Sequence, residues 1–212
     1  MNCSQCQGIE SVFDRKTAAQ KLEQYRRQGP DRTTRMLIDA LKAEGVAGLT
    51  LLDIGGGVGA IQHELIKAGV RSATSVDASS AYLAVAQDEA QRQGLAERVT
   101  HRHGDFVDLA GEVAPADIVT LDRVICCYHE MRRLVGLSSA RARRFYGVVY
   151  PRDTWWTRLG LALGNVFLRL SRNPFRTFVH PTTAVDGVIR GNGLKPRFYR
   201  QTFIWQVVVY AR

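Results

Sequence analysis

The amino-acid sequence predicts an α/β fold, in which strands of a mostly parallel sheet alternate with helices on both faces. The apolar run 49–54 stops at glycines, and a helix-compatible run follows at 60–67. The same order recurs at 72–77, a strand-like run, and at 80–90, where apolar residues fall at helical spacing. This alternation is typical of a sheet covered by helices.

The turn after the first strand is the most informative segment. Gly55, Gly57 and Ala60 satisfy the G-x-G-x-x-G/A pattern that binds a dinucleotide pyrophosphate. Glycine tolerates positive φ and lets a ligand approach the backbone, and the N–H groups that open the next helix would face that ligand. Purely structural glycines produce the same pattern, so the glycines alone do not define the ligand.

Asp53 changes which ligand this turn is expected to bind. Its carboxylate stands two residues before the first glycine, where it would repel a pyrophosphate and attract an ammonium group. A cofactor with a cationic amino-acid end and an adenosine end meets this demand, and S-adenosylmethionine is the common example. The structural alternative is a carboxylate that interacts only with the dipole of the following helix.

Two further carboxylates end the next two strands. Asp77 closes the run 72–77, roughly 20 residues beyond the glycines, the offset at which an acidic residue accepts ribose hydroxyls. Asp105 follows a strand at 98–103 and could accept a hydrogen bond from an adenine amino group, with Phe106 near the ring. An Asx turn explains Asp105 equally well. The three strand-ending carboxylates together are more specific than any one of them.

These motifs resemble those of class I S-adenosylmethionine-dependent methyltransferases. The resemblance covers about 30–212 and rests on the segments 53–59, 76–77, 104–106 and 117–122. It implies a Rossmann-like, seven-stranded, mostly parallel sheet with a C-terminal antiparallel hairpin, which fits the β-rich runs 197–202 and 205–210. The cofactor-binding residues that it implies are Asp53, Gly55, Gly56, Gly57, Gly59, Asp77, Ala78, Asp105, Phe106, Leu121, Asp122 and Arg123.

Residues 1–30 form an N-terminal extension to the predicted methyltransferase domain at 31–212. A helix is expected over 13–25, with a break before a second helix that restarts at Asp31. In the family that the chain resembles, such segments often close over the cofactor, so Tyr25 and Arg26 are candidate lid residues. The alternative is a helix packed on the edge of the sheet.

The cysteines and their neighbours raise questions of metal binding and catalysis. Cys3 and Cys6 supply only two zinc ligands, and free thiols are the favoured interpretation, so no metal site is predicted. Cys127, Tyr128 and His129 follow the strand whose end faces the transferred methyl group in the resembled family, and are candidate catalytic residues. Methyl transfer needs mainly in-line positioning, so catalysis without a base is the alternative.

An apolar, arginine-bearing helix is expected over 155–170, inside a helical insertion at about 153–180. It could cap an apolar acceptor pocket, contact a membrane surface or pack into the core. With Tyr150, Pro151 and Arg152, the insertion is similar to that of magnesium-protoporphyrin O-methyltransferases. That likeness implies a bulky, anionic, partly apolar acceptor.

Composition and charge agree with one globular enzyme domain. A hydrophobic content of 45% over 212 residues is ordinary for such a domain. No apolar run reaches the length of a membrane span and no signal peptide is recognised, so the cytoplasm is the expected location. The net charge of +9 fits an anionic partner, whether a small molecule, acidic lipid or, less favoured, RNA; ordinary solvated surface is the alternative.

The sequence therefore predicts S-adenosylmethionine-dependent methyl transfer to a small or mid-sized acceptor, with oxygen as the favoured acceptor atom. The first alternative is an NAD(P)-dependent oxidoreductase that uses the same glycine turn. The second is a non-catalytic nucleic-acid-binding protein of the same fold, although no recognised RNA-binding module is present.

Overall fold

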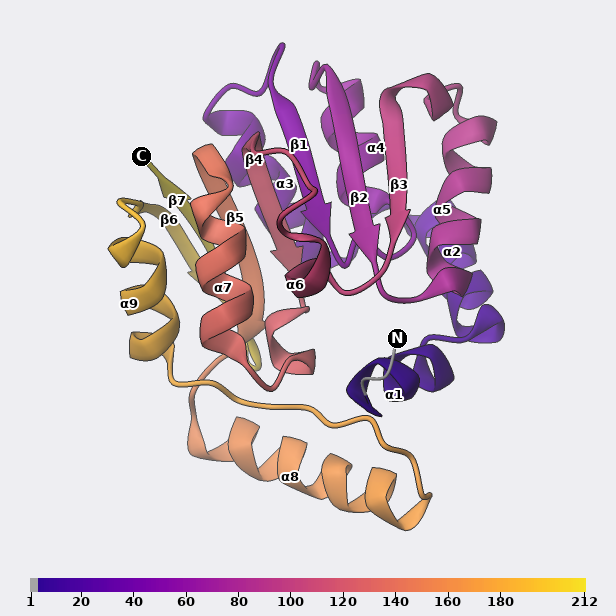
Figure 1. Cartoon of the computed structure of the whole chain (residues 1–212), viewed down its shortest axis with the longest axis vertical. Coiled ribbons are helices and arrows are strands. Elements are labelled where there is room, and N and C mark those ends of the chain that lie inside the picture. Colours follow the sequence, from indigo (N-terminus) through magenta and orange to yellow (C-terminus); the bar gives the residue numbers. More distant parts are fainter. Residues whose placement is uncertain (1–3) are drawn as a thin grey trace.

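A seven-stranded sheet forms the centre of the molecule, with strand order β3-β2-β1-β4-β5-β7-β6 (Figure 1). The structure is a computed structural model that describes residues 4–212, with side chains described from Gly8 onward. The strands are β1 (Thr50–Ile54), β2 (Ser72–Asp77), β3 (Val99–His103), β4 (Ala116–Asp122), β5 (Ala142–Pro151), β6 (Lys195–Gln201) and β7 (Trp205–Ala211). Strands β1 to β5 pair in parallel, and β7 pairs antiparallel to both β5 and β6. The predicted fold class is confirmed.

Helices cover both faces of this sheet and create two hydrophobic cores. On one face lie α3 (Arg32–Ala43), α4 (Ala60–Lys67) and α5 (Ser80–Arg92); on the other lie α6 (Phe106–Leu109), α7 (Met131–Ala140) and α9 (Thr182–Gly191). Buried leucines and isoleucines of α3 and α4 pack on the first face, while residues of α6, α7 and α9 pack on the second. Because both faces are covered, the central strands consist largely of buried residues, which explains their nearly continuous apolar runs.

The parallel pairing brings the carboxyl ends of β1 to β5 to one edge of the sheet (Figure 1). In this register Asp53 lies opposite Ser75 on β2 and Thr120 on β4. Loops that follow parallel strands at this edge are where open α/β sheets bind ligands. The fold therefore gathers the predicted site segments at one edge.

The N-terminal extension consists of two helices, α1 (Ser4–Val12) and α2 (Arg15–Gln28). The helix predicted over 13–25 is present as α2, which begins at Arg15 because Asp14 is its N-cap, whereas α1 was not predicted. The Asp14 side chain accepts a hydrogen bond from the backbone N–H of Thr17 (2.8 Å), and so caps a new helix. Figure 1 shows α1 beyond the carboxyl ends of the strands. Cys3 and the side chain of Cys6 lie outside the described residues.

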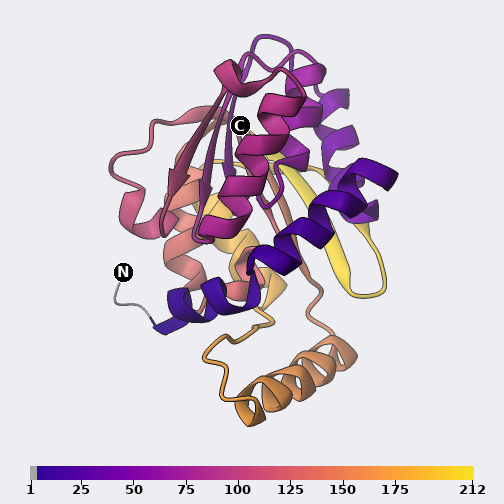
Figure 2. The ribbon, with the colours of Figure 1, turned by 90° about the vertical axis from the view of Figure 1, so that its right-hand side faces the viewer.

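Helix α8 (Trp155–Leu170) forms where the apolar, arginine-bearing segment was expected. In two perpendicular views it lies apart from the sheet and from the helices that flank it, also beyond the carboxyl ends of the strands (Figure 1 and Figure 2). The chain then returns without regular structure to α9. In the part of the chain that the structure describes, no helix is both long and apolar enough to cross a bilayer.

One buried histidine makes folding sensitive to pH. His63 on α4 is 0% exposed and stacks on Tyr25 of α2, with ring centroids 6.0 Å apart. Neither of its ring nitrogens has a hydrogen-bond partner among the described residues. Burial lowers the pKa of His63 to about 4, because a charged imidazolium would lose its hydration there.

We expect His63 to reduce the free energy of unfolding as the pH falls. The unfolded chain binds a proton near the ordinary histidine pKa of about 6.5, whereas the folded protein does so only near 4. Stability from the neutral ring is therefore present above pH ~6.5, and about 2 kcal/mol is lost between pH 7 and pH 5. Urea unfolding of His63→Leu should lack this part of the pH dependence. The exposed His103→Asn serves as control, and identical pH profiles for His63→Leu and wild type would contradict the expectation.

Candidate functional site

The glycine turn connects β1 to α4 at the carboxyl edge of the sheet. Gly57 has a φ of +56°, a conformation that L side chains rarely adopt. At Gly56 the restriction is steric: a Cβ would lie 2.3 Å from Nε2 of Gln62 and 2.8 Å from Oδ2 of Asp53. Gly59, at the N-cap of α4, makes no side-chain capping bond. The turn is thus a bare backbone surface that leads into a helix N-terminus.

The Asp53 carboxylate lies directly beneath this turn. It is 1% exposed, and it accepts hydrogen bonds from Oγ1 of Thr120 (2.7 Å) and Nε2 of Gln62 (3.1 Å). Burial raises the pKa of Asp53 to about 7, although the two hydrogen bonds act in the opposite direction. A nearby ligand cation would lower that pKa. Direct contact between Asp53 and a ligand ammonium group stays a prediction.

Asp77 ties the glycine turn to the next helix. Its two carboxylate oxygens accept hydrogen bonds from the backbone N–H groups of Gly57 (3.0 Å) and Ser79 (2.9 Å). Burial raises the pKa of Asp77, and these two bonds oppose that shift. A carboxylate has about four acceptor positions, so two remain for hydroxyl donors of a ligand. The neighbouring Ala78 presents its carbonyl oxygen to Nε2 of His103 (3.2 Å).

Asp105 and Tyr128, predicted for cofactor binding and catalysis respectively, lie in contact. The half-buried Asp105 caps α6 through the backbone N–H of Val107 (2.9 Å) and accepts a hydrogen bond from the Tyr128 hydroxyl (2.9 Å). Sequence reasoning missed this pairing, which depends on the packing of two loops. Phe106 is 3% exposed and belongs to a hydrophobic core, so its ring is not displayed at the edge of the sheet.

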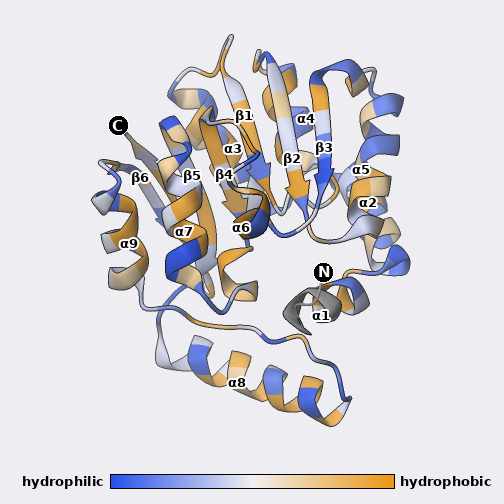
Figure 3. Cartoon of the chain, viewed as in Figure 1, coloured by the Kyte–Doolittle hydropathy of each residue, from blue (hydrophilic) through white to orange (hydrophobic). Residues whose placement is uncertain are grey.

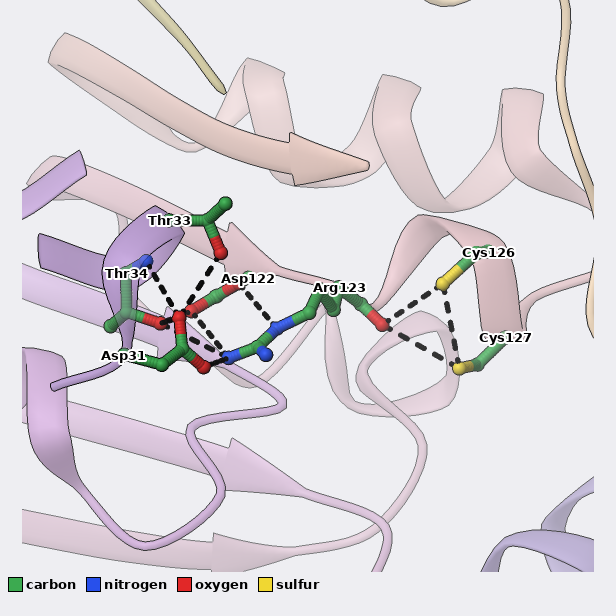
Figure 4. Close-up of polar contacts among 7 residues, drawn as sticks. All are labelled: Asp31, Thr33, Thr34, Asp122, Arg123, Cys126 and Cys127. Atoms are coloured by element: carbon green, nitrogen blue, oxygen red, sulfur yellow. Dashed lines mark hydrogen bonds and ion pairs between the residues drawn. The ribbon is translucent and has the colours of Figure 1, made fainter. Parts of the chain in front are cut away.

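The end of β4 is held by an ion-pair network (Figure 4). Leu121 is fully buried in the core, whereas Arg123 pairs with Asp31, the N-cap of α3 (2.6 Å), and with Asp122 (3.0 Å). The hydroxyl of Thr34 donates to Asp122. Although burial acts to raise it, the pKa of Asp31 is held below its usual range by the Arg123 charge and the Thr34 bonds. These side chains join α3 to β4, and their predicted contact with the cofactor stays a prediction.

Cys126 and Cys127 follow on a short 3-10 helix (Ile125–Cys127). Their sulfur atoms are 3.8 Å apart, and both thiols point toward the carbonyl oxygen of Arg123 (Figure 4). The Cys127 contact and burial raise the pKa of Cys126, so that thiol is protonated at neutral pH. The described residues contain no group of three or more metal-ligating side chains arranged to hold a metal ion.

His129 lies at a cavity of about 530 Å³ between α8 and the segment 177–181. Its exposed ring packs edge-on against Phe178, with centroids 5.5 Å apart. The cavity is lined by His129, Arg158, Leu161, Ala162, Asn165, Thr177, Phe178, Val179, His180 and Pro181. The lining residues beyond His129 were not predicted individually, because no local pattern joins α8 to the return segment.

The candidate lid residues of α2 are tied down by the neighbouring helices. The Tyr25 hydroxyl donates to Glu64 of α4 (3.0 Å), and Arg26 pairs with Glu89 of α5 (2.7 Å). These contacts correspond to the alternative interpretation of α2, a helix packed on the domain. Direct contact between Tyr25 and the cofactor stays a prediction.

A different part of the extension reaches over the strand ends. The Phe13 ring packs against Tyr82 of α5 and against Phe175 of the return segment, with centroids 5.7 and 5.6 Å apart. The backbone of Phe175 also lies against Gly8, where a Cβ would be 2.5 Å from its nitrogen. Segments from both halves of the chain therefore meet beyond the glycine turn.

The donor and acceptor set at this edge fits S-adenosylmethionine. Gly56 leaves the backbone bare above Asp53, and Gln62 Oε1 is a buried acceptor there without a partner among the described residues. Asp77 and Asp105 add acceptors at the next two strand ends, in the order that ribose and adenine would require. A pyrophosphate would meet this negative charge unfavourably.

Comparison with known proteins supports this assignment. Residues 51–142 match the family model of a methyltransferase domain. The chain is 35% identical over 88 residues to the ubiquinone/menaquinone biosynthesis C-methyltransferase UbiE of Allorhizobium ampelinum, a match that spans 41% of this chain and 32% of that relative.

Solved structures share the fold over nearly the whole chain. The magnesium protoporphyrin IX methyltransferase ChlM of Synechocystis, with bound S-adenosylhomocysteine, is 19% identical, with a TM-score of 0.72 and coverage of 98% of this chain and 99% of that one. An O-methyltransferase family protein of Burkholderia thailandensis is also 19% identical, with a TM-score of 0.71 and coverage of 96% and 62%. Residues 51–142 therefore match a methyltransferase domain, and the chain as a whole has the seven-stranded fold of class I S-adenosylmethionine-dependent methyltransferases.

Proposed function

We propose that the chain is a cytoplasmic enzyme that transfers a methyl group from S-adenosylmethionine to a small or mid-sized, partly apolar and anionic acceptor, preferably at oxygen. The observation that carries the proposal is the juxtaposition of a bare glycine turn with the buried carboxylates of Asp53 and Asp77. These groups match a ligand that is cationic at one end and rich in hydroxyls at the other.

The cofactor supplies a methyl group that is already activated on a sulfonium, so the protein has mainly to orient two reactants. Asp53 would attract the ammonium end, Asp77 would accept ribose hydroxyls, and Asp105 would border the adenine. The Tyr128 hydroxyl holds the Asp105 carboxylate in place. Binding of the cofactor at both of its ends would orient its methyl group toward the acceptor.

The cavity beside α8 supports an acceptor that is apolar with an anionic group. Leu161, Ala162 and Phe178 give it apolar walls, and the guanidinium of Arg158, which pairs with Asp153 (2.6 Å), stands at its border. Burial lowers the pKa of His180, so this ring is neutral at pH 7. Two similar structures carry names that agree: one is a methyltransferase of a porphyrin and the other belongs to an O-methyltransferase family.

Cofactor binding is the first test of the proposal. Calorimetric titration should show binding of S-adenosylhomocysteine and none of NAD. Asp53→Asn should weaken that binding by roughly 10- to 100-fold, the range expected for loss of a charge-assisted hydrogen bond. The thermal midpoint should not fall, because Gln62 can turn its unpaired Oε1 toward the new amide.

A matched control stands at the opposite edge of the sheet. Asp117, at the start of β4, accepts hydrogen bonds from the backbone N–H (2.9 Å) and the hydroxyl (2.8 Å) of Thr50. Asp117→Asn should lower stability and leave cofactor affinity unchanged. Binding of NAD in place of S-adenosylhomocysteine, or an equal effect of both substitutions on affinity, would refute the proposal.

The catalytic residues are tested with magnesium protoporphyrin IX as the first acceptor, measured as transfer of labelled methyl groups. His129→Ala should lower kcat by about 100-fold if this ring takes the acceptor proton, without changing affinity for S-adenosylhomocysteine. Tyr128→Phe should instead weaken cofactor affinity by about tenfold, because Asp105 loses a hydrogen bond. An unchanged kcat in His129→Ala would contradict a role for His129 as a base and would leave the positioning of the two reactants as the source of the rate.

A further inference from the structure

One face of α8 is apolar and turned toward solvent. Six large apolar side chains on it are 52–79% exposed, and we call them the α8 face: Trp155, Leu159, Leu163, Val166, Phe167 and Leu170. Their spacing of three or four residues places them on one side of the helix. Figure 3 shows apolar residues along the length of α8. Contiguous exposed apolar surface of this kind marks an interaction site.

The orientation of this face is fixed by contacts on the opposite side of the helix. Thr157 is buried, and Asn165 exchanges hydrogen bonds with Thr177 of the return segment (2.7 and 2.9 Å). These contacts turn the α8 face away from the domain. The interpretation of α8 as a core-packing helix is therefore wrong for this face.

A neighbouring loop extends the apolar surface. Trp156 stacks on Phe203, with ring centroids 5.6 Å apart and ring planes 15° from parallel. Phe203 is 71% exposed and Ile204 is 43% exposed, in the loop between β6 and β7. Two structural elements thus present apolar side chains together.

The charge around the α8 face has one sign. Residues 154–180 contain four arginines, Arg158, Arg169, Arg172 and Arg176, and no aspartate or glutamate. Asp153, just outside this segment, pairs with Arg158 (2.6 Å), and Arg169 and Arg172 have no acidic neighbour in sequence. An apolar surface bordered by positive charge is complementary to a layer that has an apolar interior and a negatively charged surface.

We propose that α8 docks the protein on a bilayer that contains anionic phospholipids, with the helix lying in the plane of the interface. A helix of 16 residues is about 24 Å long, which suits lying along a membrane. Tryptophan, phenylalanine and leucine on one side with arginine at the border is the composition of interfacial helices. A second copy of the chain is a poorer occupant, because two such faces would bring the like charges of Arg169 and Arg172 from both copies together.

This docking would also bring the cavity beside α8 to the lipid surface. The inner side of the same helix contributes Leu161 and Asn165 to the cavity wall. An acceptor that partitions into lipid would then reach the cavity without crossing water. This last step rests on the proposed function, whereas docking itself does not.

Vesicle sedimentation tests the docking directly. The full-length protein should sediment with vesicles of phosphatidylcholine and phosphatidylglycerol, and much less with phosphatidylcholine alone. The double substitution Leu163→Ser with Phe167→Ser should weaken this binding at least tenfold. Tyr199→Ser, which removes a 48% exposed apolar side chain from β6, should leave it unchanged. Arg169→Gln should weaken binding to the anionic vesicles only, and added salt should do the same.

Far-UV circular dichroism shows whether each variant is folded, and S-adenosylhomocysteine binding separates this proposal from the proposed function. If the protein binds vesicles but not S-adenosylhomocysteine, the docking proposal is supported and the proposed methyl transfer is refuted. Absence of binding to anionic vesicles, or equal binding by the double variant, overturns the docking proposal. A concentration-dependent dimer that the double variant abolishes also overturns the proposal, because the α8 face would then be covered by a second copy of the chain.

Discussion

The buried carboxylate of Asp53 is the constraint on which the arrangement of strand ends depends. A charge at 1% exposure is tolerated only where donors surround it, and here they come from β4 through Thr120 and from α4 through Gln62. The same Gln62 amide reaches Ser75 on β2 (2.8 Å). One polar cluster therefore fixes three strands and a helix relative to the glycine turn. At Gly56 the turn has no room for a side chain, because a Cβ there would collide with this cluster.

Local patterns in the sequence were sufficient for the strands and for helices α2, α3, α4, α5 and α8, and they place the candidate cofactor residues at the strand ends. Asp53, the glycines and Asp77 stand at strand ends, which periodicity locates well. The start of α2 was predicted at residue 13 and lies at Arg15, because it depends on one capping residue, Asp14. The contact of Tyr128 with Asp105 and that of Arg123 with Asp31 join segments distant in sequence. Such pairs follow from tertiary packing, which no spacing rule encodes.

Sequence similarity to known methyltransferases covers less of the chain than structural similarity does. The methyltransferase model ends at residue 142, whereas the structural match to ChlM continues through 98% of the chain. The matched part holds Asp53, Asp77 and Asp105, the residues proposed to bind the cofactor, whose chemistry is constant. The remainder includes α8 and the return segment, which border the cavity assigned to a variable acceptor. Relatives can therefore share the sheet while differing in what they methylate.

The insertion that contains α8 leaves the sheet after β5 and rejoins it at α9, so its length is independent of the strand register. Its helix is joined to the return segment by the paired bonds of Asn165 to Thr177 and to the β6–β7 loop by the stacking of Trp156 on Phe203. Because the entropic cost of closing a loop grows only slowly with its length, this segment can be lengthened, shortened or exchanged at little expense to the folded sheet. The helix is in this sense a modular attachment, and its proposed parts in membrane docking and in the acceptor cavity can change without altering the sheet.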